Sequence, residues 1–82
     1  MKRAVHPGEV LLEDYLKPRG ATATHLANTL GVPVNRITQI VAGKRSITAK
    51  TAVLLARALG TTPEFWLNLQ NAHDLTIAGA PR

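Results

Sequence analysis

The chain has 82 residues, carries a formal net charge of +5 at pH 7 and contains no cysteine, which excludes disulfides and thiolate metal sites. So short a chain forms one domain over residues 1–82 and buries only about 60% of the surface that its unfolded form exposes, so we expect a homodimer to supply further buried area. Its longest apolar run, residues 52–56, is far shorter than the roughly 20 residues of a membrane span, and no targeting segment is visible. We therefore expect a cytoplasmic protein, and the basic charge favours an acidic or polyanionic partner.

Short helices separated by glycine and proline are the only regular structure that the sequence predicts. They are expected over about residues 7–17, 23–30, 33–41, 49–59 and 63–75. Threonine caps and prolines mark the helix starts, and glycines mark most of the ends. These residues are Thr22, Thr48, Thr62, Pro7, Pro33, Pro63, Gly20, Gly31, Gly43 and Gly60. The sequence thus predicts an all-α domain with a loose N-terminal arm over residues 1–5 and a frayed tail over residues 76–82.

The helix expected over residues 33–41 has an unusual outer face. Its apolar residues gather on one side, and Asn35 and Gln39 lie nearly opposite, one turn apart. An ordinary surface helix would carry Lys and Glu there, whereas an amide presents a donor and an acceptor together, as the reading of a base edge requires. With the preceding helix and the glycine turn, this segment has the form of a helix-turn-helix. A plain antiparallel helix pair is the alternative, but a nearly uncharged polar face followed by Lys44 and Arg45 favours DNA binding.

The predicted contacts with DNA follow from side-chain chemistry. Asn35 and Gln39 are the best base readers, since each can pair bidentately with adenine. Val34 either touches a thymine methyl group or belongs to the core, and Thr38 serves a base or a phosphate. Contacts with the DNA backbone, which set register without reading sequence, are predicted for Thr22, Thr24, Arg36, Lys44 and Arg45.

The last predicted helix carries more apolar side chains than one core can cover. These side chains are Phe65, Trp66, Leu67 and Leu69. We predict that they form the dimer interface.

Catalytic and metal chemistry find little support in the sequence. The histidines and acids have no spacing typical of metal ligands, and Ser46 is the only serine, so there is no nucleophilic triad. The adjacent acids Glu13 and Asp14 point about 100° apart on a helix and do not converge on one site. We expect neither a metal, nor a cofactor, nor an enzyme.

Several stretches of the chain resemble one protein family. They are H-P-G-E at residues 6–9, L-A-N-T-L-G-V at 26–32, G-K-R-S-I-T at 43–48, P-E-F-W-L-N-L-Q at 63–70 and D-L at 74–75. A helix-turn-helix match alone is weak, but the first and fourth stretches together make the match specific. Over nearly its whole length the chain is similar to the HigA-type antitoxins of bacterial toxin–antitoxin modules. They lie within the Cro/cI-type (XRE) family, whose fold is a five-helix, lambda-repressor-like DNA-binding domain.

The resemblance implies a function with two partners. Proteins of this group bind and neutralise a small basic RelE-like mRNA endonuclease, and as dimers they repress their own operon at a palindromic site in double-stranded DNA. The resemblance also implies that the helix over residues 33–41 is the recognition helix, that the loop over residues 43–48 lies against the DNA backbone, and that the last helix takes part in the dimer. Val34 and His73 depart from the pattern of the group, which commonly has a polar and an aromatic residue there.

Of the predicted binding surfaces, the one that would hold a toxin is the least well defined by the sequence. A basic toxin needs an acidic patch, and the only acidic cluster consists of Glu9, Glu13 and Asp14 in the first predicted helix. Two other functions stay open, namely a stand-alone XRE-type transcriptional regulator without a toxin and a protein-interaction module with little DNA binding. A neighbouring reading frame for a small basic protein would favour the antitoxin.

Overall fold

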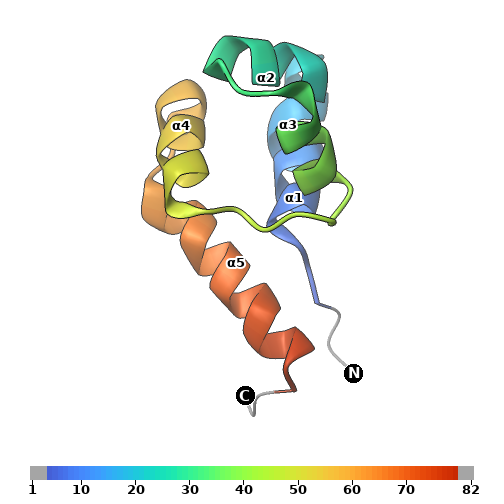
Figure 1. The fold of residues 1–82 in the computed structure, drawn as a ribbon, viewed down its shortest axis with the longest axis vertical. Coiled ribbons are helices and arrows are strands. Elements are labelled where there is room, and N and C mark those ends of the chain that lie inside the picture. Colours follow the sequence, from blue (N-terminus) through green and yellow to red (C-terminus); the bar gives the residue numbers. More distant parts are fainter. Residues whose placement is uncertain (1–3, 80–82) are drawn as a thin grey trace.

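The computed structural model describes residues 4–79, and the regular structure of these residues is entirely helical (Figure 1). The elements are α1 (Pro7–Val10), the π-helical turn η1 (Leu11–Leu16), the 3-10 turn η2 (Lys17–Arg19), α2 (Ala23–Leu30), α3 (Val34–Val41), α4 (Ala49–Leu59) and α5 (Pro63–Ile77). Because α1, η1 and η2 are continuous, the predicted all-α fold of five helical segments is confirmed. The looseness predicted for residues 1–3 and 80–82 lies outside the described residues. No helix within residues 4–79 combines the length and the apolar character needed to cross a membrane.

The first helical segment changes its hydrogen-bond register before Pro18. His6 caps its start, where Nδ1 accepts from the backbone N–H of Gly8 at 2.9 Å. Further on, the N–H of Lys17 donates to the carbonyl of Leu12, five residues earlier, as in a π-helix. Pro18 has no N–H, and its ring would clash with the carbonyl four residues before it, so an α-helical register cannot continue through it. The segment ends just after Pro18, as predicted, but the sequence did not predict the π-helical turn.

A glycine turn sets α3 against α2. Gly31 has φ 73°, and the N–H of Val32 donates back to the carbonyl of Ala27 at 3.1 Å, which closes α2. Pro33 follows with φ −57° and ψ 141°, so it is the N-cap of α3 and the first helical residue is Val34. The predicted turn is confirmed, with the helix start one residue later than expected.

The core is built around Trp66, which is fully buried. Its ring lies near those of Tyr15 and Phe65, with centroid distances of 5.4 and 5.0 Å, and its Nε1 donates to Oγ1 of Thr61 at 2.7 Å. The other members of the buried apolar cluster are Leu11, Leu16, Leu26, Ala27, Ile37, Ile40, Ile47, Ala52 and Leu55. Every helical segment except η2 supplies apolar side chains that belong to this cluster or pack against it. The small domain therefore has one continuous core.

The inner side of α3 is tightly held. Ile37 and Ile40 are both 0% exposed. The first helical segment approaches so closely that a Cβ atom added to Gly8 would lie 1.7 Å from the carbonyl oxygen of Ile40. Only glycine permits this approach, and it fixes α3 relative to the rest of the domain.

Helix α5 extends beyond the other helices at its C-terminal end (Figure 1). It continues to Ile77, two residues past the predicted end, and the hydroxyl of Thr76 donates to the carbonyl of Ala72 at 2.9 Å. The frayed tail predicted to begin at Thr76 is therefore wrong for these two residues, because the helical hydrogen bonds persist to Ala78, whose N–H donates to the carbonyl of Asp74.

Candidate nucleic-acid interface

The outer face of α3 is polar and open to solvent. Asn35 and Thr38 are exposed, and Gln39 is half-buried. Val34 is 39% exposed and lies outside the buried cluster, so it does not belong to the core. Of its two predicted roles, contact with a thymine methyl group is the one that this position allows. Since the opposite side of the helix is fixed in the core, these side chains stand on a rigid platform, as recognition of a base edge requires. Arg36 is half-buried beside them.

The loop after α3 turns back toward the helix that it leaves. Gly43 has φ 76°, a left-handed conformation that favours glycine. The N–H of Gly43 donates to the carbonyl of Ile40 at 3.0 Å, and the N–H of Lys44 donates to the carbonyl of Gln39 at 2.8 Å. This pair of bonds is a Schellman motif, and it returns the chain toward the outer face of α3.

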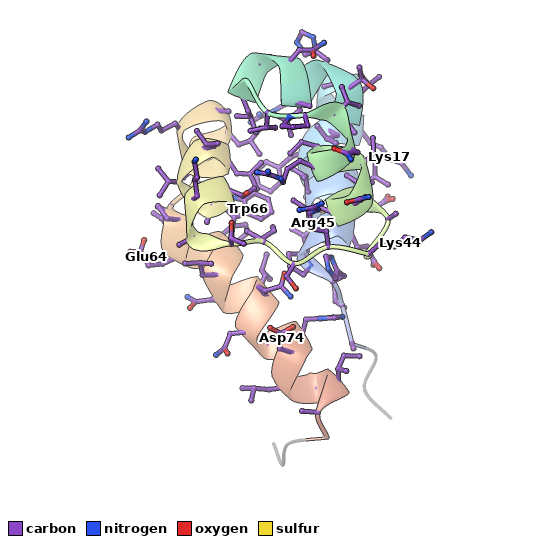
Figure 2. All side chains as sticks on the ribbon, in the orientation of Figure 1. Lys17, Lys44, Arg45, Glu64, Trp66 and Asp74 are labelled. Carbon is purple, nitrogen blue, oxygen red and sulfur yellow. The ribbon has the colours of Figure 1, made fainter. Side chains whose placement is uncertain are left out.

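The two basic residues of the loop have different surroundings. Both are exposed. Nε of Arg45 donates to Oε1 of Gln39 at 2.9 Å, which attaches this guanidinium to α3. Lys44 extends from the loop into solvent (Figure 2). The loop therefore brings one cation to a predicted base reader and leaves the other free of the helix.

The start of α2 brings two hydroxyl groups to the surface. Oγ1 of Thr22 accepts from the backbone N–H of His25 at 3.0 Å, so the predicted N-cap is confirmed. Its hydroxyl hydrogen is not used by that bond and can still donate to a phosphate. Thr24, the second residue of α2, is exposed.

A buried glutamine, which the sequence reasoning missed, holds the far end of the basic loop. Gln70 of α5 is only 6% exposed, and its Oε1 accepts from the backbone N–H of Ile47 at 2.8 Å. Its Nε2 donates to Oδ1 of Asp74 at 2.9 Å. One signal was present in the sequence, because Gln70 lies four residues after Trp66 and so on the same face of the helix.

His6 holds the same loop near its start. Its ring lies edge-on to that of His73, with 4.9 Å between centroids, and it is hydrogen-bonded to the backbone of Arg45. Burial, and after it the neighbouring His73, lower the pKa of His6, whereas Asp74 and the backbone bond act in the opposite direction. A neutral imidazole keeps one nitrogen as the acceptor that caps α1 and the other as a donor. His6 thus serves both the start of α1 and the loop.

The side chains predicted to form a dimer interface have unequal exposure. Trp66 is 0% exposed within the single chain, so the prediction is wrong for this residue: its ring fills the core and has no surface to offer a partner. The other three, Phe65, Leu67 and Leu69, are half-buried and pack against the core. The large apolar residues of α5 that are exposed lie further along, at Leu75 (49% exposed) and Ile77 (68% exposed).

The predicted acidic cluster lies on the first helical segment. Glu13 and Asp14 are exposed, and Glu9 is half-buried. Oε2 of Glu13 lies 2.8 Å from Nζ of Lys17, one turn later. Among residues 4–79, no group of three or more His, Cys, Asp or Glu side chains has an arrangement that could hold a metal ion.

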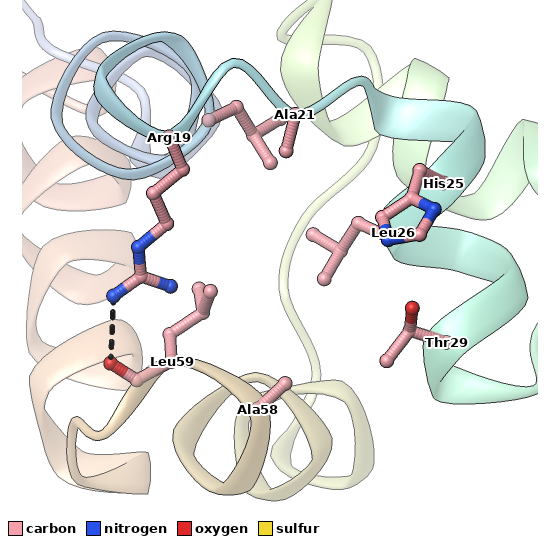
Figure 3. Close-up of a pocket in the computed structure, with 8 residues that line it drawn as sticks. Arg19, Ala21, His25, Leu26, Thr29, Ala58 and Leu59 are labelled. Atoms are coloured by element: carbon pink, nitrogen blue, oxygen red, sulfur yellow. Dashed lines mark hydrogen bonds between the residues drawn. The ribbon is translucent and has the colours of Figure 1, made fainter.

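A hollow of about 300 Å³ lies between the first helical segment, α2 and α4 (Figure 3). Its lining includes Leu26 and Leu59, with Arg19 and His25 among its polar members. Nη2 of Arg19 donates to the carbonyl of Leu59 at 3.5 Å and so caps the end of α4, and its guanidinium lies 5.7 Å from the ring centroid of Tyr15. None of the predicted DNA-contacting residues lines this hollow.

Comparison with known proteins places the chain in a family. A family model described as "Helix-turn-helix" matches residues 12–66, from η1 to the first turn of α5. Antitoxin HigA-1 of Vibrio cholerae serotype O1 is 46% identical over 74 residues, which cover 90% of this chain and 70% of that protein. The chain belongs to the HigA-type helix-turn-helix family. The resemblance noted in the sequence is therefore confirmed.

Solved structures of the HigA-type family have the same fold. An addiction module antidote protein of the HigA family from Coxiella burnetii is 52% identical, with a TM-score of 0.89 over 94% of this chain and 84% of that one. The Pseudomonas aeruginosa antitoxin HigA, solved with the higBA promoter, is 36% identical, with a TM-score of 0.91 over 93% of this chain and 83% of that one. The family consists of DNA-binding antitoxins and regulators and not of enzymes.

Proposed function

We propose that this chain is an antitoxin that represses its own operon by placing α3 in the major groove of a palindromic operator, and that it also neutralises a RelE-like toxin by direct binding. The observation that carries the DNA-binding part is the difference between the two sides of α3. Ile37 and Ile40 are fully buried, while Asn35 and Thr38 are exposed on a face without acidic residues. A helix held in this way can enter a groove without losing its anchorage.

The contacts with DNA divide into reading and positioning. Asn35 and Gln39 read bases, with Thr38 and the exposed Val34 at the same face. The positioning contacts with phosphates come from Thr22, Thr24, Arg36, Lys44 and Arg45. Support also comes from the Pseudomonas aeruginosa antitoxin HigA, which shares the fold and was solved with promoter DNA.

We assign the dimer interface to α5. A palindromic site requires two recognition helices related by a two-fold axis, about 34 Å apart. Phe65, Leu67 and Leu69 remain in this interface as half-buried apolar residues, and Leu75 and Ile77 extend it along the exposed end of the helix. Burial of these side chains would also supply area that a domain of this size lacks.

We assign the toxin contact to the acidic cluster of the first helical segment. Glu13 and Asp14 are exposed, and Glu9 lies one turn before them. The ion pair between Glu13 and Lys17 is solvent-exposed, so it contributes little and can be exchanged for a cation of a basic partner.

Hydroxyl-radical footprinting of the DNA upstream of the coding frame tests the repressor function. We expect two protected patches of equal size on one side of the duplex, separated by about one helical turn. A single patch, or uniform weak protection along the whole fragment, would exclude the dimeric recognition proposed here. Asn35→Ala should abolish the footprint at a protein concentration at which Asn28→Ala, which removes an exposed amide from α2, preserves it.

The toxin contact is tested by co-expression with the product of the neighbouring reading frame. The wild-type chain should relieve the growth arrest that this product causes, and should co-purify with it. The double variant Glu13→Lys, Asp14→Lys should lose both properties while it still binds DNA, whereas Glu64→Lys, at an exposed acid of α5, should keep them. A neighbouring product that neither arrests growth nor binds the wild-type chain would favour a stand-alone regulator.

A further inference from the structure

The side-chain pair of Gln39 and Arg45 is the starting point for an inference about base preference. Nε of Arg45 lies 2.9 Å from Oε1 of Gln39. Arginine nitrogens are donors only, so the amide atom that faces the guanidinium must be the oxygen. This contact therefore determines which end of the amide points away. It is Nε2, which makes no hydrogen bond with any of residues 4–79.

The backbone holds this pair in place before DNA arrives. The N–H of Lys44 donates to the carbonyl of Gln39, and Gly43 makes the left-handed turn that this bond requires. Arg45 follows directly, and its backbone is hydrogen-bonded to the imidazole of His6. The loop is thus fixed on both sides of the guanidinium, and much of the entropy cost of ordering it is met during folding.

An amide without such a partner reads adenine best. It donates to N7 and accepts from the amino group at N6, so both of its ends are used. The oxygen of Gln39 faces Arg45, so the end of the amide that is turned away from the guanidinium is the donor Nε2. Guanine presents two acceptors in the major groove, N7 and O6, and matches a surface made only of donors.

We propose that Arg45 is a positioning residue that sets the base preference of Gln39, so that the pair selects guanine where the amide alone would select adenine. This inference rests on the proposed operator binding by α3. It also replaces the phosphate contact assigned to Arg45 above, and it revises the prediction from sequence that Gln39 pairs with adenine.

The test is a set of duplexes in which each base pair of the upstream operator is replaced in turn by the other three. The pair read by Gln39 is the one whose preference disappears in Gln39→Ala. At this position the wild-type chain should bind guanine at least about tenfold more tightly than adenine. Arg45→Ala should lower this ratio about tenfold, to a value near one or in favour of adenine.

Lys44→Ala is the matched control, because it removes one positive charge from the neighbouring residue and leaves intact the backbone N–H through which Lys44 is bonded to Gln39. It should weaken binding to all duplexes alike and leave the ratio of guanine to adenine unchanged. In the Gln39→Ala background, Arg45→Ala should change no base preference, since the side chain through which it acts is absent. Circular dichroism of each variant verifies that the exposed substitutions leave the helices intact.

The outcomes separate the inference from the function on which it rests. If the wild-type chain prefers its upstream DNA but Arg45→Ala keeps the base ratio, or if adenine is preferred at the Gln39 position, the inference is wrong and the repressor function stands. If Gln39→Ala changes no position, the same conclusion holds, with base reading left to Asn35. If the wild-type chain binds operator and scrambled DNA alike, both the function and the inference are wrong.

Discussion

The substitution Gln70→Ala removes the side chain that holds the basic loop to α5. At 6% exposure, Gln70 accepts from the backbone N–H of Ile47 at 2.8 Å, and Ile47 is itself 3% exposed. In the variant this N–H has no protein acceptor, and the loop that carries the cations loses its attachment to α5. The effect should therefore appear in both stability and DNA binding.

The expected loss of stability follows from the burial of the orphaned donor. A buried N–H without a partner costs about 1–3 kcal/mol. The second bond of Gln70 should add little, because Asp74 is exposed and its carboxylate can bind water instead. For a domain of this size, whose free energy of unfolding is on the order of 4–12 kcal/mol, a loss of about 2 kcal/mol is a large fraction. The corresponding fall in Tm is about 8–16 °C.

Urea unfolding followed by circular dichroism measures this loss, and Asn68→Ala is the control because Asn68 is exposed on the same helix. Asn68→Ala should change the free energy of unfolding by no more than about 0.5 kcal/mol. The reasoning would be refuted if Gln70→Ala cost no more than the control. Binding to any duplex should also weaken in Gln70→Ala, because the far end of the loop that carries the cations is no longer held to α5.

Four further predictions follow from the same geometry. Asn35→Ala should cost about 1–3 kcal/mol on the upstream operator and relax the preference at one base pair per half-site, and an equal loss on scrambled DNA in an anisotropy titration would contradict base reading. Lys44→Ala should weaken binding to all sequences and reduce the slope of log affinity against log salt by about one, so an unchanged slope would exclude a phosphate contact. Gly8→Ala should lower the free energy of unfolding by about 1–3 kcal/mol or more, because the added Cβ meets the carbonyl of Ile40 at 1.7 Å; an unchanged Tm would show that α1 is not held so closely. The pKa of His6 is lower in the folded chain than in the unfolded chain, so the unfolded chain binds a proton more readily. His6 should therefore contribute stability that is fully present above its ordinary pKa of 6.5 and declines as pH falls toward the lower pKa of the folded state. This part of the pH dependence of Tm should vanish in His6→Asn, which can still cap α1, and should persist in His25→Gln.

Helix boundaries were predictable because their signals are local. Thr22, Thr48 and Thr62 each accept from the N–H three residues later, as a threonine N-cap does in any protein. The outer face of α3 was predictable for a similar reason, since the helical period alone separates Asn35 and Gln39 from the buried isoleucines. These features depend on neighbours within one or two turns.

Contacts between distant segments were not predictable in the same way. Trp66 was assigned to the dimer interface because the sequence does not reveal how much of the circumference of α5 the domain itself covers. In the fold, the rings of Tyr15 and Phe65 lie against Trp66. The bond from Gln70 to Ile47 joins residues 23 positions apart, so neither residue signals it. The contact between Arg45 and Gln39 depends on the return of the chain after Gly43. The glycine predicts a turn at this point, but it does not predict the direction in which the chain continues.

The central claim is that α3 reads the DNA upstream of its own gene, and fluorescence anisotropy tests it most directly. The wild-type chain is titrated against labelled upstream duplex and against a scrambled duplex of equal length, each at two salt concentrations. We expect a preference of about a thousandfold or more for the upstream duplex, within the range of specific recognition. Equal, salt-sensitive binding to both duplexes would contradict the claim, because it would mean that the basic charge acts while the polar face of α3 reads nothing.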